Sequence, residues 1–150
     1  MDNESSRIES EANVSAYLAK LRYALENNAA LDFQQVRGVD EARDIQYTNR
    51  YTVAELFPDE DPQEVLREEL RTLKTKDYLR TVKDLRFPKR SDMWEFGKVY
   101  RRSDESTEVY IKIRVELLDA RLSGNHTVFV MSFHRAEKPF EREHFPYCLT

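Results

Sequence analysis

Residues 108–117, EVYIKIRVEL, carry side chains whose types suit acid–base and phosphate chemistry. Taken alternately, this stretch separates an apolar set from a polar set that includes Tyr110, Lys112, Arg114 and Glu116. Strict alternation is typical of a half-buried strand, because successive side chains leave a strand on opposite faces. The stretch therefore predicts a strand with one face in the core and an unusual outer face that holds a phenol, two cations and a carboxylate.

Two further segments can add polar groups to that outer face. In residues 128–135, VFVMSFHR, alternation from Phe133 places Phe129, Met131 and Phe133 inward, and Val128, Val130, Ser132 and His134 outward. In residues 93–102, turning Trp94, Phe96 and Tyr100 inward leaves Glu95 and Arg101 outside. If the three segments pair as neighbouring strands, one surface displays a carboxylate, a tyrosine, a lysine, two arginines and a histidine.

That set of groups suits the cleavage of RNA without a metal. The 2′-hydroxyl must lose a proton, the phosphate must gain charge stabilisation, and the leaving 5′-oxygen must be protonated. Glu95, Tyr110 or His134 can act as acid or base, while Lys112 and Arg114 can hold the phosphate. The candidate catalytic residues are therefore Tyr110, His134 and Glu95, with RNA as the expected substrate.

Each residue also has an ordinary role that competes with this interpretation. Lys112 and Arg114 can form simple ion pairs with Glu116, and Tyr110 is a common strand residue that the C-terminal tail can cover. A histidine at the end of a strand, such as His134, is by itself more often a surface residue than a catalyst. Only their joint placement on one face favours chemistry.

The sequence offers no pattern for a metal or a cofactor. His126, His134 and His144 are spaced by eight and ten residues, unlike the histidine pairs of zinc sites, and the chain has one cysteine, Cys148. With three glycines in all, it holds no phosphate loop and no dinucleotide-binding fingerprint. We therefore expect neither a bound metal nor a cofactor.

Three helices are predicted before the strands. Residues 13–28 have an apolar stripe at spacings of three and four, and Asp61 with Pro62 marks the start of a second helix that runs to Leu73. Residues 75–84 are predicted as a third, shorter helix. Short strands are predicted at 33–36 and 45–53. Three strands need a layer to cover them, so we expect an α+β fold with N-terminal helices on a C-terminal antiparallel sheet.

Composition sets the broad class. The chain has 150 residues, 35% of them charged, with a net charge of −4. Its charge is uneven, since residues 1–75 hold 16 acidic and 9 basic side chains while residues 76–102 hold 4 and 9. We expect one cytoplasmic domain over 1–150, with no membrane association, a flexible segment at 1–12, and an aromatic tail at 136–150 that packs on the sheet or its edge.

The strands around Trp94, Tyr110 and His134 resemble the MqsR-like toxins of bacterial toxin–antitoxin systems, which belong to the RelE-like ribonucleases. The resemblance lies in the segments W-E-F-G-K-V-Y, V-Y-I-K-I and V-F-V-M-S-F-H. It implies a RelE-like (microbial ribonuclease-like) fold and mRNA cleavage without metal. It also implies neutralisation by a cognate antitoxin protein.

The resemblance assigns roles residue by residue. The family's active-site tyrosine corresponds to Tyr110, its lysine at the end of the last strand to His134, its glutamine after the tryptophan to Glu95, and its helical lysine to Arg80. Histidine for lysine changes a fixed cation into a titratable group. The full set of expected RNA-binding residues is Arg80, Lys112, Arg114 and Arg101. A non-catalytic RNA- or ribosome-binding module, or a protein-interaction domain using the acidic helical half, remains the alternative to the enzyme.

Overall fold

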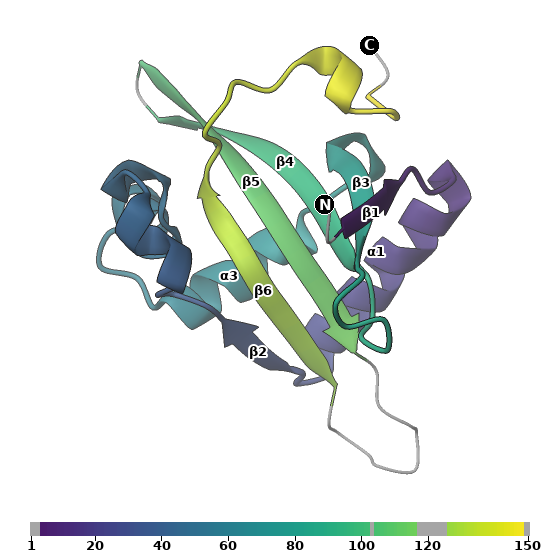
Figure 1. Ribbon diagram of the computed structural model, residues 1–150. Helices are drawn as coiled ribbons and strands as arrows, with labels where there is room; N and C mark the ends of the chain where they lie inside the picture. The colour runs from purple at the N-terminus through teal and green to yellow at the C-terminus, as the bar shows by residue number, and fades with distance from the viewer. Residues whose placement is uncertain (1–3, 103, 117–125, 149–150) are drawn as a thin grey trace.

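The computed structural model, which describes residues 4–102, 104–116 and 126–148, is built on a six-stranded sheet (Figure 1). The strand order is β1-β3-β4-β5-β6-β2, and every neighbouring pair is antiparallel except β2 with β6. The strands are β1 (Glu4–Arg7), β2 (Ala30–Phe33), β3 (Tyr78–Asp84), β4 (Met93–Arg102), β5 (Glu105–Glu116) and β6 (Thr127–Arg135). The three C-terminal strands expected from the sequence, β4, β5 and β6, thus lie within a larger sheet. The strands β1, β2 and β3 extend it at its two sides.

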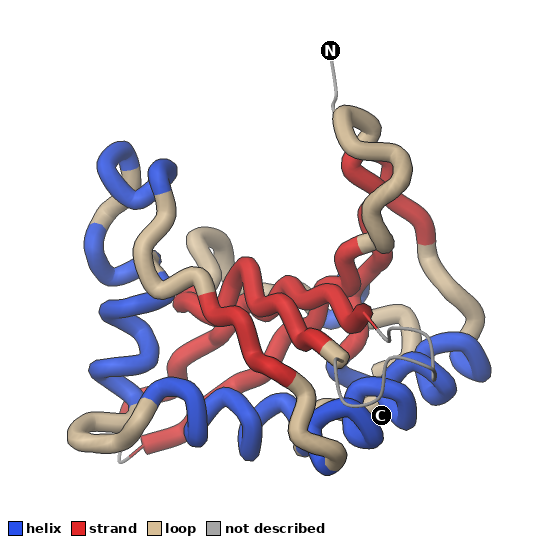
Figure 2. Tube along the Cα trace, turned by 90° about the horizontal axis from the view of Figure 1, so that it is seen from below, coloured by secondary structure: helices blue, strands red, loops and turns tan. Residues whose placement is uncertain are grey.

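Helices α1 (Glu11–Glu26) and α3 (Pro62–Arg71) cover one face of the sheet, as Figures 1 and 2 show. Both confirm the apolar stripes read from the sequence. Ser10 caps α1, where its hydroxyl accepts a bond of 3.1 Å from the amide of Asn13, and Asp61 caps α3 ahead of Pro62. No helix in the described part of the chain has the length and apolarity needed to cross a membrane.

The predicted helix at 75–84 is wrong, because residues 78–84 form strand β3 after a short 3-10 turn at Thr75–Asp77. The segment is too short for periodicity to separate a helix from a strand, and Thr81 and Val82 are β-branched. Pairing with the edge of β4 buries Tyr78, Thr81 and Val82 fully. Arg80 consequently lies on a strand and not on a helix.

The expected strand at 45–53 is also wrong. Residues Ile45–Tyr47 form a 3-10 turn, and α2 (Asn49–Leu56) follows, with the hydroxyl of Thr48 accepting a bond from the amide of Tyr51. The strand expected at 33–36 occurs earlier, as β2, and pairs in parallel with β6. Thr48, Asn49 and Thr52 are buried, and buried polar side chains need internal partners. The helix lies beside β6, where Asn49 and Thr52 find these partners on the strand backbone (Figure 1).

A bulge in β6 at Met131 overturns half of the predicted face assignment. Lys112 pairs with Ser132, but the next residue, Ile113, pairs with Val130, so Met131 is the extra residue. One extra residue exchanges the two faces of a strand. Phe133, Ser132 and His134 lie as predicted, whereas Val128 and Val130 are buried in the core and Phe129 turns outward beneath Arg114.

Asn49 holds this bulge in place. Its side-chain amide donates to the backbone carbonyls of Met131 (2.9 Å) and Gln34 (2.7 Å), and its Oδ1 accepts from the amide of Phe133 (2.9 Å). Two residues further along β6, the hydroxyl of Thr52 accepts from the amide of Arg135 (2.9 Å). Side chains of α2 therefore replace the missing strand along β6 beyond the end of β2.

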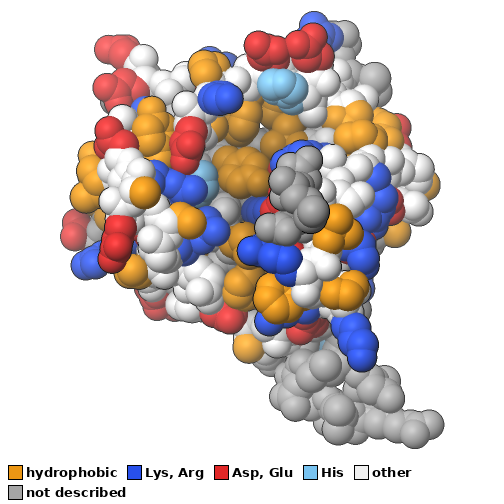
Figure 3. All heavy atoms as spheres, in the orientation of Figure 1, with side chains coloured by type: hydrophobic (Ala, Val, Ile, Leu, Met, Phe, Trp, Pro, Cys, Tyr) orange, Lys and Arg blue, Asp and Glu red, His pale blue; other side chains and the backbone are white. Residues whose placement is uncertain are grey.

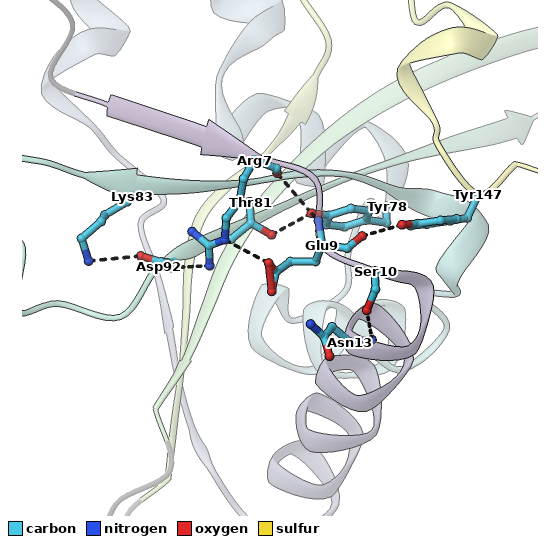
Figure 4. Close-up of polar contacts among 9 residues, drawn as sticks. All are labelled: Arg7, Glu9, Ser10, Asn13, Tyr78, Thr81, Lys83, Asp92 and Tyr147. Atoms are coloured by element: carbon cyan, nitrogen blue, oxygen red, sulfur yellow. Dashed lines mark hydrogen bonds and ion pairs between the residues drawn. The ribbon is translucent and has the colours of Figure 1, made fainter.

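The N-terminal segment is tied to β3 by a group of polar contacts (Figure 4). The hydroxyl of Tyr78 accepts from the amide of Glu9 at 3.0 Å and lies 2.8 Å from Thr81 Oγ1. Arg7 bridges Glu9 and Asp92 at 2.9 and 2.6 Å. Residues 4–7, expected in the flexible segment, thus pair as strand β1 and bring the carboxylate of Glu4 over the open face of the sheet.

The C-terminal tail returns across the same open face (Figure 1). Phe140 and Phe145 meet edge to face, with ring centroids 5.5 Å apart, over Gly97. A Cβ atom at position 97 would lie 2.9 Å from both rings, so this close approach requires glycine. Tyr147 stacks near Tyr78 and donates to the carbonyl of Glu9, which links the tail to the N-terminal segment.

Asn49→Ala is expected to lower the free energy of unfolding by about 2–4 kcal/mol, because it leaves buried amide and carbonyl groups of the bulge without partners. Denaturant unfolding followed by tryptophan fluorescence measures this change. Asn13→Ala, an exposed asparagine on α1, is the matched control and should change it by less than about 0.5 kcal/mol. Equal effects of the two variants would contradict the role given to Asn49.

Candidate active site

A hollow of about 520 Å³ lies on the open face of the sheet, where Lys and Arg side chains gather (Figure 3). It brings together residues from β3, β4, β5, β6, the 37–43 segment and the start of the tail. Of the residues that the sequence singled out, five line it: Arg80, Glu95, Tyr110, Lys112 and His134. Ser132 lines it too, as the outward parity of β6 near its end predicts.

Glu95 is the buried centre of this group. Only 2% of its surface is exposed, yet it is a carboxylate on the middle strand of the site. Arg80 donates from Nε to Glu95 Oε1 at 2.9 Å, and Lys112 Nζ lies 3.9 Å from Oε2. A buried charge is tolerated only when it is paired, so Arg80 and Lys112 hold Glu95 in its position.

Tyr110 lies between Glu95 and His134. Its register partner on β4 is Gly97 and on β6 is His134, and the Tyr110 and His134 rings are 5.5 Å apart. Burial, followed by the negative charge of Glu95 with which the hydroxyl interacts, raises the pKa of Tyr110 far above its ordinary value. Tyr110 therefore keeps its proton at neutral pH and can donate it.

His134 has the opposite tendency. Burial is the main cause that lowers its pKa from 6.5, and the nearby positive charges of Arg43 and Arg37 add to it. Its Nδ1 lies 2.8 Å from the carbonyl oxygen of Arg135. A carbonyl can only accept, so Nδ1 carries the hydrogen and Nε2 carries the lone pair. His134 is thus a neutral imidazole that can take up a proton at Nε2.

Arg37 and Arg43 belong to the site although the sequence analysis missed them. They flank the 3-10 helix Gly38–Ala42 within segment 37–43; Arg37 Nη1 lies 3.4 Å from Ser132 Oγ, and Arg43 pairs with Glu137 at 2.9 Å. With Lys138 they raise the hollow to five cationic side chains against two carboxylates, Glu95 and Glu137. No motif marks these arginines, because only the path of the 37–43 segment beside β6 brings them near.

Two predicted residues lie outside the hollow. Arg114 pairs with Glu116 at 2.9 Å and covers the ring of Phe129. It therefore forms the simple ion pair that was the alternative to phosphate binding. Arg101 is exposed towards the tip of the β4–β5 hairpin. Both were predicted to bind RNA on the basis of strand parity, but parity places a side chain on a face and not at a point along it.

The hollow combines a proton acceptor, a proton donor and a surplus of positive charge. This combination suits a ligand with one or more phosphates and a reaction that moves protons. Across the described residues, His, Cys, Asp and Glu side chains form no group of three or more that could hold a metal ion.

Comparison with protein-family models, curated proteins and solved structures finds no match to this chain. Its function must therefore be argued from the chemistry of the hollow.

The lowered pKa of His134 has a consequence for stability. In the folded state His134 binds a proton less readily than in the unfolded chain, so its contribution makes the protein less stable as the pH falls through and below 6.5. We expect His134→Gln to reduce the loss of unfolding free energy between pH 7 and pH 5, measured by denaturant unfolding at each pH. His126→Gln is the control, and an equal reduction by both variants would contradict the assignment.

Arg80→Met is expected to lower the free energy of unfolding by about 1–3 kcal/mol, because it removes the hydrogen-bonded cation from the buried Glu95. Adding Glu95→Gln should restore part of the loss, and a double-mutant cycle measures this coupling. Arg71→Met is the matched control, since its arginine is similarly exposed but pairs with exposed Glu26 and Glu68. That variant should change stability by less than about 1 kcal/mol. Zero coupling between Arg80 and Glu95 would refute the network.

Proposed function

We propose that the protein is a metal-independent endoribonuclease that cleaves single-stranded RNA by attack of the 2′-hydroxyl on the adjacent phosphate. The observation that carries the proposal is the pairing of a neutral His134 with a protonated Tyr110 across a cationic hollow. General acid–base catalysis needs a proton acceptor and a proton donor that can reach the same reacting group, and the neutral His134 beside the protonated Tyr110 supplies this pair.

His134 acts as the base in this reaction. Nε2 takes the proton of the 2′-hydroxyl, and the 2′-oxygen forms a bond to phosphorus. The hydrogen bond from Nδ1 to the Arg135 carbonyl fixes the imidazole in the tautomer that this step requires. Glu137, which also faces the hollow, raises the pKa of His134, but burial together with the positive charges of Arg43 and Arg37 outweighs it, so the imidazole is neutral before the reaction.

Tyr110 acts as the acid, and the cations stabilise the phosphorane. As the bond from phosphorus to the 5′-oxygen breaks, the phenol gives its proton to that oxygen, leaving a 2′,3′-cyclic phosphate and a free 5′-hydroxyl. Arg37, Arg80 and Lys112 supply positive charge where negative charge develops on the phosphate. Glu95 contributes indirectly: it holds Arg80 and Lys112, and it keeps Tyr110 protonated.

The proposal includes the toxin role that the MqsR-like resemblance implies. In that role a cognate antitoxin protein prevents RNA from reaching the hollow. The support for it is the sequence resemblance around Trp94, Tyr110 and His134, together with a hollow that is open on one face of the sheet.

The test is incubation of the purified protein with single-stranded RNA in the presence of EDTA. We expect products that end in a 2′,3′-cyclic phosphate, and no cleavage of DNA of the same sequence, which lacks the attacking hydroxyl. Tyr110→Phe and His134→Ala should each lower the cleavage rate by about 10²–10⁴-fold, the range for loss of a positioned acid or base. End-group analysis and single-turnover kinetics measure both effects.

Matched controls separate chemistry from folding. Tyr23→Phe changes an exposed tyrosine on α1, and His126→Ala changes a histidine outside the hollow; both should retain the full rate. Intact RNA with salt-sensitive binding would show a non-catalytic RNA-binding module instead. If the wild-type protein neither binds nor cuts RNA, the proposed function is wrong.

A further inference from the structure

The loop between β3 and β4, residues 85–92, exposes apolar side chains among cations. Phe87 is 44% exposed and Leu85 is 49% exposed, so neither side chain packs into the hydrophobic core. The proposed reaction uses no residue of this loop. Single exposed apolar side chains are common on protein surfaces, so the feature that distinguishes Phe87 is the set of cations around its ring.

The ring of Phe87 is framed by two guanidinium groups. Arg90 stands over it at 4.1 Å from the ring centroid, and Arg86 lies 5.9 Å from it. Arg86 is held by Asp84 through two hydrogen bonds of 3.0 and 3.1 Å, whereas Arg90 forms no ion pair with any carboxylate of the described residues. The backbone amide of Arg90 also donates to the carbonyl of Phe87 at 3.0 Å, which fixes the two residues in one turn.

Glu4 connects this loop to the hollow. Glu4 pairs in register with Asp84, at the end of β3, and its carboxylate reaches Lys112 in the hollow at 3.4 Å. The same carboxylate is close enough to raise the pKa of both Arg86 and Arg80. In Figure 2 the β3–β4 loop rises beside β1 on the open side of the sheet, opposite the helices. Figure 3 shows Lys, Arg and hydrophobic side chains together on this side of the molecule.

We propose that Phe87 and Arg90 form a base-stacking subsite for single-stranded RNA that extends from the hollow. The inference rests on the proposed function, since it takes the strand cleaved at Tyr110 and His134 to continue over β1 to this loop. Aromatic rings and guanidinium planes are the surfaces on which unpaired bases stack, and free cations hold the phosphates between them. Arg90 can serve both purposes because no carboxylate of the described chain occupies it.

Binding without cleavage isolates this subsite from the chemistry. Fluorescence anisotropy with a labelled 12-nucleotide RNA bearing 2′-O-methyl groups measures binding to the intact protein, because the methylated oxygen cannot attack the phosphate. Phe87→Leu, which keeps an apolar side chain but removes the ring, should weaken binding by about tenfold. Phe87→Tyr keeps the ring and should stay within about twofold of the wild-type affinity.

Arg90→Ala supplies a second readout with a different signature. It should reduce the slope of log affinity against log salt concentration by about one, because one phosphate contact is lost. Tyr23→Leu, at an exposed tyrosine on α1, is the control for loss of an aromatic surface residue and should bind as the wild type does.

The outcomes separate this inference from the proposed function. Weaker binding by Phe87→Leu, while Phe87→Tyr and Tyr23→Leu keep the wild-type affinity, supports the subsite. This holds whether or not unmodified RNA is cleaved. Equal binding by Phe87→Leu and the wild type overturns it, even if unmodified RNA is cleaved as proposed. Failure of the wild type to bind the methylated RNA at low salt also overturns it, and the cleavage assay on unmodified RNA then decides the proposed function separately.

Discussion

The three hydrogen bonds of Asn49 are the constraint on which the site depends. A β-bulge leaves backbone groups unpaired, and buried unpaired groups are costly, so a bulge in an interior strand needs a partner from elsewhere. Asn49 supplies both a donor and an acceptor to the bulge in β6. Without the extra residue at Met131, His134 and the valines of β6 could not face opposite sides in this register.

A single buried carboxylate then organises the charges of the hollow. Glu95 attracts Arg80 and Lys112, so two cations gather on strands where they would otherwise repel each other. Burial is the main cause that raises the pKa of Tyr110, and the negative charge of Glu95 adds to it; burial is also the main cause that lowers the pKa of His134, and the charges of Arg43 and Arg37 add to that. Burial and neighbouring charges thus act in the same direction on each residue, so Tyr110 keeps its proton and His134 stays neutral.

The sequence predicts the parts of the site that local periodicity determines. Alternation in 108–117 places Tyr110 and Lys112 on one face, and apolar spacing identifies α1 and α3. Periodicity could not reveal the bulge at Met131, since its cause is a side chain 82 positions away, nor the arginines of 37–43, which lie in a segment without a repeat. Residues 75–84 were too short to distinguish a strand from a helix, and pairing with β4 decided the matter.

The acidic character of the whole chain does not oppose a cationic site of this kind. At physiological ionic strength, charges separated by more than about 8 Å are largely screened in solvent, so the acidic residues on and before α3 act weakly across the sheet. The cations of the hollow act at contact distance, and Arg37, Arg43 and Lys112 are partly withdrawn from water, where the field of each is stronger. A net charge of −4 describes how the molecule behaves at long range, and the hollow sets what it attracts at short range.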